Sequence, residues 1–238
     1  MSSLYIVMPA YNEAMGIEAT LEQWYPIVER VGPDSRLVVI DDGSKDGTFD
    51  ILRRFAVDHP QLIAITKPNG GHGATVRFGY AFALERNADF IFQTDSDGQT
   101  EPGEFWHFWD LRERYDMVIG KRHDREDGLS RVIVTRVLRG VVHACFRTNI
   151  PDANAPFRLM SHESLAECLE LVPEDHSLTN VVLAVIYFKK HKRIRFVPIT
   201  FRDRRGGSNS IDLGDITRIG ANALRDFVQL NRQIDRAL

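Results

Sequence analysis

The sequence has few cysteines, which excludes a disulfide framework and a cysteine-based metal site. Its 238 residues include two cysteines, Cys145 and Cys168, separated by 23 positions and without a CxxC pattern. Both fall inside helical patterns, so we expect reduced thiols in the core of a cytosolic protein.

Long apolar runs and an excess of positive charge are also missing. The apolar stretch LTNVVLAVIYF is too short to span a bilayer and ends in KKHKR. The opening residues MSSLYIVMPAYN lead directly into a predicted strand, without the pattern of a signal peptide. The formal net charge is −3, so no overall basic field attracts nucleic acid. We therefore expect a cytoplasmic protein that does not bind nucleic acid.

Two common nucleotide-binding motifs are absent as well. The segment KPNGGHGATVRFG contains neither GxxxxGK[ST] nor GxGxxG, and it follows the third predicted strand instead of the first. This argues against a P-loop NTPase and against a classical dinucleotide fold. The segment does open a predicted helix, where glycines allow the backbone to approach a phosphate closely.

What the sequence does contain is an alternation of short apolar runs with helical patterns. The strand-like runs of the first half are LYIVMPA, RLVVIDDGS, LIAITKPNGG, FIFQTD and DMVIGKR. They are uniformly rich in Val, Ile and Phe, as expected for parallel strands that are buried on both faces. The pattern predicts an α/β fold with a Rossmann-like, doubly wound and mostly parallel sheet that has helices on both faces.

The second half departs from this alternation. It contains the predicted strands APFRLM and RIRFVPITFR, the basic loop DRRGGSNS and an amphipathic helix from Asp215. We find no internal repeat and no low-complexity linker, so we predict a single domain.

Acidic residues follow the fourth predicted strand, at the edge where α/β sheets bind ligands. Asp95, Asp97 and Gln99 alternate along the chain, so their oxygen atoms can converge on Mg²⁺ or Mn²⁺. The alternative is an Asx-rich turn, which Asp, Ser and Gly commonly form.

The ends of the first two strands carry further candidates. Asp41 and Asp42 end the second strand and can accept hydrogen bonds from a base or a ribose. Tyr11, in PAYNE after the first strand, can pack on a flat ring. The alternative is that PAYNE only marks the passage from strand to helix, with Pro9 ending the strand and Asn12 capping the helix.

Together these stretches resemble family 2 glycosyltransferases of the GT-A fold. The motifs that carry the resemblance are IVMPAYNE, VVIDDGSKDGT, NGGHGATVRFGYAFA, DSDGQ, the FR of Phe157–Arg158 and RRGGSNS. Each motif is common, but their order and spacing from about residue 4 to residue 210 are specific. Within this family the sequence is similar to the polyprenyl- and dolichyl-phosphate sugar synthases.

The resemblance implies a hexosyltransferase-type enzyme that takes a sugar from a UDP or GDP donor. It implies one domain, 1–238, with a nucleotide-sugar half at 4–121 and an acceptor half at 122–238 that ends in a helix. The positions that match donor-binding residues are Pro9, Tyr11, Glu13, Asp41, Asp42, Asp95, Ser96 and Arg204, with Arg205 as the alternative to the last. Asp95, Asp97 and Gln99 match the ligands of a Mg²⁺ or Mn²⁺ ion, and Asp97 would bind the ion on the donor diphosphate.

The acceptor is open between a lipid phosphate and a hydroxyl group. Arg122, Arg131 and Thr135 are similar to positions that hold the phosphate of a polyprenyl phosphate, a nucleophile that needs no general base. The helix that carries Arg131 and Thr135 would then lie on the inner face of the membrane. The alternative is that Arg131, Arg136 and Arg139 form the solvated stripe of an ordinary helix.

A hydroxyl acceptor on a glycan or small molecule would require a general base. The candidates are Asp152 and the pair Glu174–Asp175, although PED also has the pattern of a helix start. The candidate catalytic residues are therefore Asp97, Asp152, Arg158, Glu174 and Asp175. We favour an inverting transferase to polyprenyl phosphate, with a soluble transferase and a non-catalytic nucleotide-sugar-binding partner as alternatives. His72, His176 and His191 lack metal-like spacing, and we expect them to be ordinary polar residues.

Overall fold

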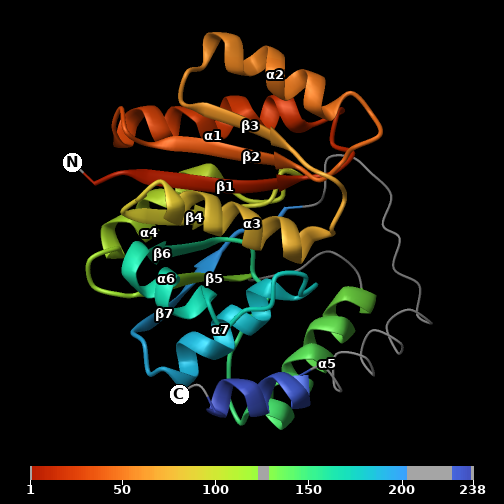
Figure 1. The fold of residues 1–238 in the computed structure, drawn as a ribbon, viewed down its shortest axis with the longest axis vertical. Helices are drawn as coiled ribbons and strands as arrows, with labels where there is room; N and C mark the ends of the chain where they lie inside the picture. Colours follow the sequence, from red (N-terminus) through yellow and green to blue (C-terminus); the bar gives the residue numbers. More distant parts are fainter. Residues whose placement is uncertain (1, 123–128, 203–226, 237–238) are drawn as a thin grey trace.

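One mixed sheet organises the chain. The computed structural model describes residues 2–122, 129–202 and 227–236, and within 129–137 it describes the backbone path only. Its strands are β1 (Leu4–Ala10), β2 (Arg36–Asp41), β3 (Leu62–Thr66), β4 (Phe90–Gln93), β5 (Met117–Arg122), β6 (Arg158–Ser161) and β7 (Ile194–Ile199). They form a single sheet in the order β3-β2-β1-β4-β6-β5-β7 (Figure 1).

The predicted parallel arrangement is confirmed, with one exception. Strands β3, β2, β1 and β4 are parallel to one another, and β5 is parallel to β7. Strand β6 runs antiparallel to both β4 and β5. Its direction places Arg158, the first residue of β6, opposite Gln93, the last residue of β4. A residue from the second half of the chain thereby reaches the edge at which β4 ends.

Helices cover both faces of the sheet, as predicted (Figure 1). They are α1 (Ile17–Val31), α2 (Thr48–Asp58), α3 (His72–Glu85), α4 (Phe105–Leu111), α5 (Leu129–Phe146), α6 (His162–Leu169) and α7 (Thr179–Lys189), with a short 3₁₀ helix at Pro102–Glu104. Residues 227–236 are also helical.

Alternating strand side chains supply two hydrophobic cores, because successive residues of a strand point to opposite faces. Ile6 and Met8 of β1 pack with helices α1, α2 and α4. Val7, between them, packs with helices α3, α6 and α7. These two cores explain why the strand sequences read as continuous apolar runs.

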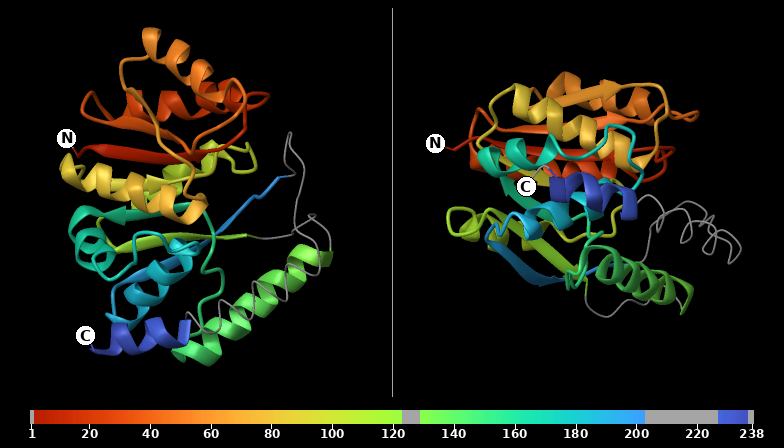
Figure 2. Two further views of the ribbon diagram at one scale, coloured as in Figure 1. Left: turned by 45° about the vertical axis from the view of Figure 1, so that its right-hand side comes forward. Right: turned by 60° about the horizontal axis from the view of Figure 1, so that its bottom comes forward.

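The second half of the chain adds a group of helices beside the sheet. Helix α5 extends away from the sheet in both views of Figure 2. Phe146 at its end packs against Phe227, with ring centroids 5.2 Å apart. Phe227 and Leu230 are buried, as the predicted amphipathic tail requires, while residues 215–226 lie outside the described part. Within the described residues, no helix is long and apolar enough to cross a membrane.

The first helix begins later than the sequence pattern indicates. We expected it from about Glu13, but α1 begins at Ile17. Residues 13–16 form a turn in which the carbonyl of Glu13 accepts hydrogen bonds from the amides of Gly16 and Ile17. The turn keeps PAYNE at the end of β1 in a loop.

Close packing between α3 and β1 gives a test of the fold. A Cβ on Gly79 would lie 2.3 Å from Cγ1 of Val7 and 2.9 Å from Cδ1 of Ile40. Overpacking should make Gly79→Ala less stable than the wild type by about 1–3 kcal/mol, measured by urea unfolding. The control is Gly140→Ala in α5, where, apart from the helix's own backbone, no atom of the described residues lies within 4 Å of an added Cβ. Gly140→Ala should raise the free energy of unfolding by up to about 1 kcal/mol, because alanine has a higher helix propensity than glycine. Equal stability of Gly79→Ala and wild type would contradict the packing.

Candidate active site

Parallel strand direction collects the candidate residues at one edge of the sheet. Strands β1, β2 and β4 end at Ala10, Asp41 and Gln93, and the loops that follow them meet at this edge (Figure 1). Helix α3 begins at the same edge, at His72. The carboxylates predicted from the sequence are therefore next to a helix N-terminus, which favours negative charge.

The carboxylate of Asp95 is held by two side chains. Its Oδ1 lies 3.1 Å from Nε2 of His72 and accepts a hydrogen bond of 3.3 Å from Nε2 of Gln93. Desolvation raises the pKa of Asp95, but His72, with smaller contributions from Arg122 and Gln93, lowers it, and the net pKa is below the ordinary value. Desolvation also works against the protonated form of His72, but Asp95 raises the pKa of the imidazole above its ordinary value.

His72 is a site residue that the sequence analysis missed. We expected an ordinary polar residue, because its neighbours in sequence are glycines and no metal-like spacing links it to other histidines. The contact joins residues 23 positions apart. The signal that was available is its place at the end of the glycine-rich segment, where the predicted helix begins.

Asp97 and Gln99 lie in a turn after β4. Oδ1 of Asp97 accepts a hydrogen bond of 3.1 Å from the backbone amide of Gln99, and Gly98 between them has φ 72°. This is the Asx-type turn that the sequence analysis considered as an alternative. The buried side chain of Gln99 donates from Nε2 to the carbonyl of Arg202 at 2.7 Å, which fixes the direction of its amide.

The donor set at this turn suits a hard divalent cation that is shared with a substrate. The described residues include no group of three or more His, Cys, Asp or Glu side chains arranged for a metal ion. Two carboxylates and an amide oxygen are oxygen ligands, and Mg²⁺ commonly uses one or two carboxylates together with water and substrate phosphates. Asp95, Asp97 and Gln99 therefore fit a cation that is completed by a diphosphate.

Asp42 holds the glycine-rich loop in place. Its carboxylate forms an ion pair with Lys67 and accepts hydrogen bonds of 2.9 Å from the amides of Gly70 and Gly71. Burial opposes ionisation of Asp42, but Lys67 and Gly70 lower its pKa below the ordinary value. The loop that leads into His72 is thus anchored to the end of β2.

The other predicted donor-binding residues are spread along the same edge. Asp41 is buried and accepts hydrogen bonds from the amide of Ser44 at 3.2 Å and from Oγ1 of Thr66 at 2.7 Å. Tyr11 is 43% exposed, which leaves it accessible to a ligand. Pro9 and Ser96 are buried, and Glu13 donates its backbone amide to Oγ1 of Thr48 at 2.9 Å.

Arg122 and Asp152 form a nearly buried ion pair. The guanidinium donates from Nε to Oδ2 at 2.8 Å and from Nη2 to Oδ1 at 2.7 Å. The side chains are 10% and 8% exposed. Both oxygens of Asp152 are therefore engaged by one arginine, which also lies over the ring of Phe201 at 5.2 Å.

Arg158 is completely buried. Its guanidinium donates to the carbonyls of Ala153, Ala155 and Asn180 at 2.5–3.1 Å. Burial disfavours the charged form and lowers the pKa of Arg158. Arg158 therefore shapes the backbone behind Gln93. Because its side chain is completely buried, it cannot touch a bound substrate.

The remaining candidates lie in the turn before α7 or outside the described part. Glu174 and Asp175 are exposed in the turn before α7, and Glu174 lies 3.7 Å from Nη1 of Arg77. The side chains of Arg131 and Thr135, and all of Arg204 and Arg205, lie outside the described residues. Arg202, just before the last two, pairs with the backbone of Gln99.

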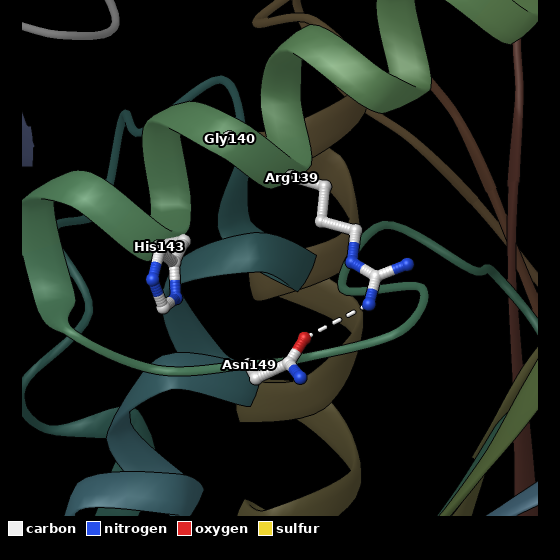
Figure 3. Close-up of a pocket in the computed structure, with 4 residues that line it drawn as sticks. All are labelled: Arg139, Gly140, His143 and Asn149. Carbon is white, nitrogen blue, oxygen red and sulfur yellow. Dashed lines mark hydrogen bonds between the residues drawn. The ribbon is translucent and has the colours of Figure 1, made fainter.

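A pocket of about 460 Å³ lies between α5 and the loop that follows it (Figure 3). It is lined by Arg139, Gly140, His143 and Asn149. Nη2 of Arg139 donates to Oδ1 of Asn149 at 2.9 Å. None of the predicted site residues is among these four.

Comparison with solved structures agrees with the fold described above. Glucosyl-3-phosphoglycerate synthase from Mycobacterium tuberculosis, crystallised with Mn²⁺, uridine diphosphate and glucosyl-3-phosphoglycerate, superposes with a TM-score of 0.71. The match covers 96% of this chain and 80% of that one, at 19% sequence identity. The sheet and its helices are those of a GT-A glycosyltransferase.

Sequence comparison identifies the family. The model of glycosyl transferase family 2 matches residues 5–169. The chain belongs to glycosyl transferase family 2 and is a glycosyltransferase, which confirms the resemblance found in the motifs.

Named relatives match over different lengths. The chain is 26% identical to an undecaprenyl-phosphate mannosyltransferase of Micrococcus luteus over 92% of its own length and 91% of the relative's. It is 35% identical to a dolichyl-phosphate beta-glucosyltransferase of Trichomonas vaginalis, but over 42% of this chain and 30% of that protein. The chain thus matches less than a third of the second relative and nearly the whole of the first.

The Arg122–Asp152 pair gives a prediction about stability. Asp152→Asn leaves a nearly buried guanidinium without its counter-charge and should destabilise the protein by about 3 kcal/mol in urea unfolding. A double-mutant cycle with Arg122→Met should give a coupling energy of about 1–3 kcal/mol. The matched control is the pair Arg193–Asp116, in which the arginine side chain is 61% exposed. Its coupling should stay below about 1 kcal/mol. Equal coupling in the two pairs would contradict the structure.

Asp42 should contribute stability that depends on pH. A carboxylate whose folded-state pKa is lowered stabilises the native state above its unfolded pKa, and that stability is lost as the pH falls through the folded pKa. The advantage of wild type over Asp42→Asn should therefore be complete above pH 3.8 and shrink as the pH drops below it. Thermal unfolding between pH 2.5 and 7 measures this. The stability of Asp58→Asn, at an exposed position of α2, should change with pH in the same way as that of wild type. If the difference in stability between Asp42→Asn and wild type does not change with pH, the lowered pKa of Asp42 is wrong.

Proposed function

We propose that this glycosyltransferase moves a sugar from a nucleoside diphosphate to a polyprenyl phosphate, with inversion at the anomeric carbon and with a Mg²⁺ or Mn²⁺ ion at Asp95 and Asp97. The observation that carries the proposal concerns the contacts and the exposure of the three candidate bases. Asp152 is bound by Arg122 through both oxygens, while Glu174 and Asp175 lie exposed in the turn before α7. Both oxygens of Asp152 are therefore engaged, and among the described residues neither Glu174 nor Asp175 makes a hydrogen bond or an ion pair with Asp95.

An acceptor that is already ionised removes the need for a base. The second pKa of a phosphate monoester is near 6, so at neutral pH most of the acceptor carries a nucleophilic oxygen. That oxygen attacks the anomeric carbon from the face opposite the leaving group. A new carbon–oxygen bond forms to the acceptor phosphate, the bond to the donor diphosphate breaks, and the nucleoside diphosphate leaves with the electron pair. No proton has to be removed.

The residues of this chain then bind and orient the two phosphorylated substrates. Asp95, Asp97 and Gln99 would hold the cation, which neutralises charge on the departing diphosphate. The N-terminus of α3, set by Asp42 through Gly70 and Gly71, faces the same charge. Tyr11 offers its exposed ring to the base of a UDP or GDP donor. Arg122, with Arg131 and Thr135, would bind the acceptor phosphate, and Arg204 the donor phosphates.

The named relatives support this choice of acceptor. The relative that matches nearly the full chain is called an undecaprenyl-phosphate mannosyltransferase, and another is called a dolichyl-phosphate glucosyltransferase. A lipid acceptor would bring the protein to the surface of the membrane, and we propose peripheral contact at its cytoplasmic face.

Transfer to lipid is the direct test of the proposal. Purified protein should be incubated with Mn²⁺ and a panel of labelled UDP and GDP sugars, with and without polyprenyl phosphate. We expect label in the organic extract only when the lipid is present. Label on a water-soluble glycan or small molecule in the absence of lipid would support the soluble transferase instead.

Substitutions separate the two acceptor classes further. Asp97→Asn should lower transfer by about 100-fold or more, because a cation ligand is lost. Asp58→Asn, at the other end of α2 from the site edge, is the control for loss of a single carboxylate. Asp175→Asn should keep full transfer to lipid phosphate, since no base is required. A loss of 100-fold or more in Asp175→Asn would contradict the base-free mechanism.

A further inference from the structure

A buried chain of polar side chains runs behind Asp95. Tyr80 of α3, Gln93 of β4 and Asn180 of α7 are all buried, with Tyr80 and Gln93 fully shielded from solvent. The hydroxyl of Tyr80 lies 2.9 Å from Oε1 of Gln93 and 3.2 Å from Oδ1 of Asn180. Nε2 of Gln93 in turn lies 3.3 Å from Oδ1 of Asp95. The successive elements α3 and β4 thus meet the later helix α7 behind one carboxylate.

The orientation of Asn180 can be worked out from the hydrogen-bond count. Tyr80 has one hydroxyl proton, but both oxygens next to it are acceptors, so it can satisfy only one of them. At the same time Nδ2 of Asn180 is buried and has no hydrogen-bond partner among the described residues. Exchanging the oxygen and nitrogen of this amide removes the conflict at Tyr80, because Nδ2 then donates to the hydroxyl and the hydroxyl proton is left for Gln93.

With that exchange each group has a defined role. Asn180 donates to Tyr80, Tyr80 donates to Oε1 of Gln93, and Nε2 of Gln93 is left facing Oδ1 of Asp95. The same Oδ1 receives the contact from His72. Both described hydrogen bonds therefore fall on Oδ1, and we expect Oδ2 to be the oxygen that meets a ligand.

We propose that Asn180, Tyr80 and Gln93 form a positioning chain that orients the carboxylate of Asp95 toward the cation. The proposal rests on the proposed function, since it assigns the cation to Asp95. Tyr80 and Gln93 act through Asp95 and touch no substrate. Partners that orient a metal ligand commonly change metal affinity when they are removed, even though they do not contact the ion.

The backbone supports the chain from behind. The carbonyl of Asn180 accepts a hydrogen bond of 3.0 Å from Nη1 of Arg158, which fixes the first turn of α7. Gly73, next to His72, lies against the turn that precedes α7. A Cβ added to Gly73 would be 2.2 Å from the carbonyl oxygen of His176. The start of α3 and the start of α7 are therefore packed against each other, and the chain has little freedom to separate.

The test measures Mn²⁺ binding, independently of turnover. Free Mn²⁺ is followed by electron paramagnetic resonance in a titration of the protein at saturating UDP. Tyr80→Phe should raise the Kd for Mn²⁺ by about 10-fold. The matched control is Tyr187→Phe, which removes another buried hydroxyl, bonded to Oγ of Ser164 at 2.9 Å. Its Kd should equal that of wild type. An unchanged Kd in Tyr80→Phe would overturn the proposal.

A second set of variants tests whether Tyr80 acts through Gln93. Gln93→Leu should raise the Kd for Mn²⁺ by a similar factor, and adding Tyr80→Phe to it should cause no further change. Additive effects would show that the two residues act separately and would overturn the chain. Circular dichroism confirms that each variant is folded, and Gln93→Leu provides the test if Tyr80→Phe is not.

Asp97→Asn distinguishes failure of the chain from failure of the proposed function. If Asp97→Asn binds Mn²⁺ as wild type does, the cation site itself is wrong. If Asp97→Asn loses Mn²⁺ while Tyr80→Phe keeps it, only the positioning chain is wrong. Loss of Mn²⁺ affinity in both, with Tyr187→Phe unaffected, supports both conclusions.

Discussion

Repulsion between carboxylates has to be balanced at the edge of the sheet where β1, β2 and β4 end. The parallel strands β2 and β4 deliver four acidic side chains to it, namely Asp41, Asp42, Asp95 and Asp97. Like charges that are partly removed from water repel strongly unless donors or cations lie near them. The structure supplies Lys67 and two glycine amides to Asp42, and His72 and Gln93 to Asp95. In our account a divalent cation completes this compensation at the turn of Asp97.

The same compensation explains why parts of the chain that are far apart have to meet here. The amides that neutralise Asp42 come from the loop before α3, and the start of that helix brings His72 to Asp95. The reversed strand β6 brings Arg158 behind Gln93 and keeps a positive charge beneath the site without exposing it. Arg122, at the end of β5, is matched by Asp152. Charge balance and fold are therefore set by the same contacts.

Much of the fold could be predicted from the sequence, because burial on both faces leaves continuous apolar strands such as LYIVMPA. The direction of β6 could not, since its four residues have no pattern that distinguishes parallel from antiparallel pairing. At the site, the sequence pointed to Asp95 and Asp97 because both follow closely on the end of β4. The contacts of His72 with Asp95, Arg122 with Asp152 and Tyr80 with Asn180 join residues 23, 30 and 100 positions apart. Such pairs depend on tertiary packing, and local patterns do not reveal them.

We propose that Asp95 and Asp97 hold a divalent cation together with the donor diphosphate. The most direct measurement is an anomalous difference map from crystals grown with Mn²⁺ and a nucleoside diphosphate. The account predicts a peak about 2.1 Å from Oδ2 of Asp95 and from the carboxylate of Asp97, in contact with the diphosphate. A diphosphate bound at this edge with no anomalous peak beside it, or with both carboxylates turned into solvent, would contradict the account.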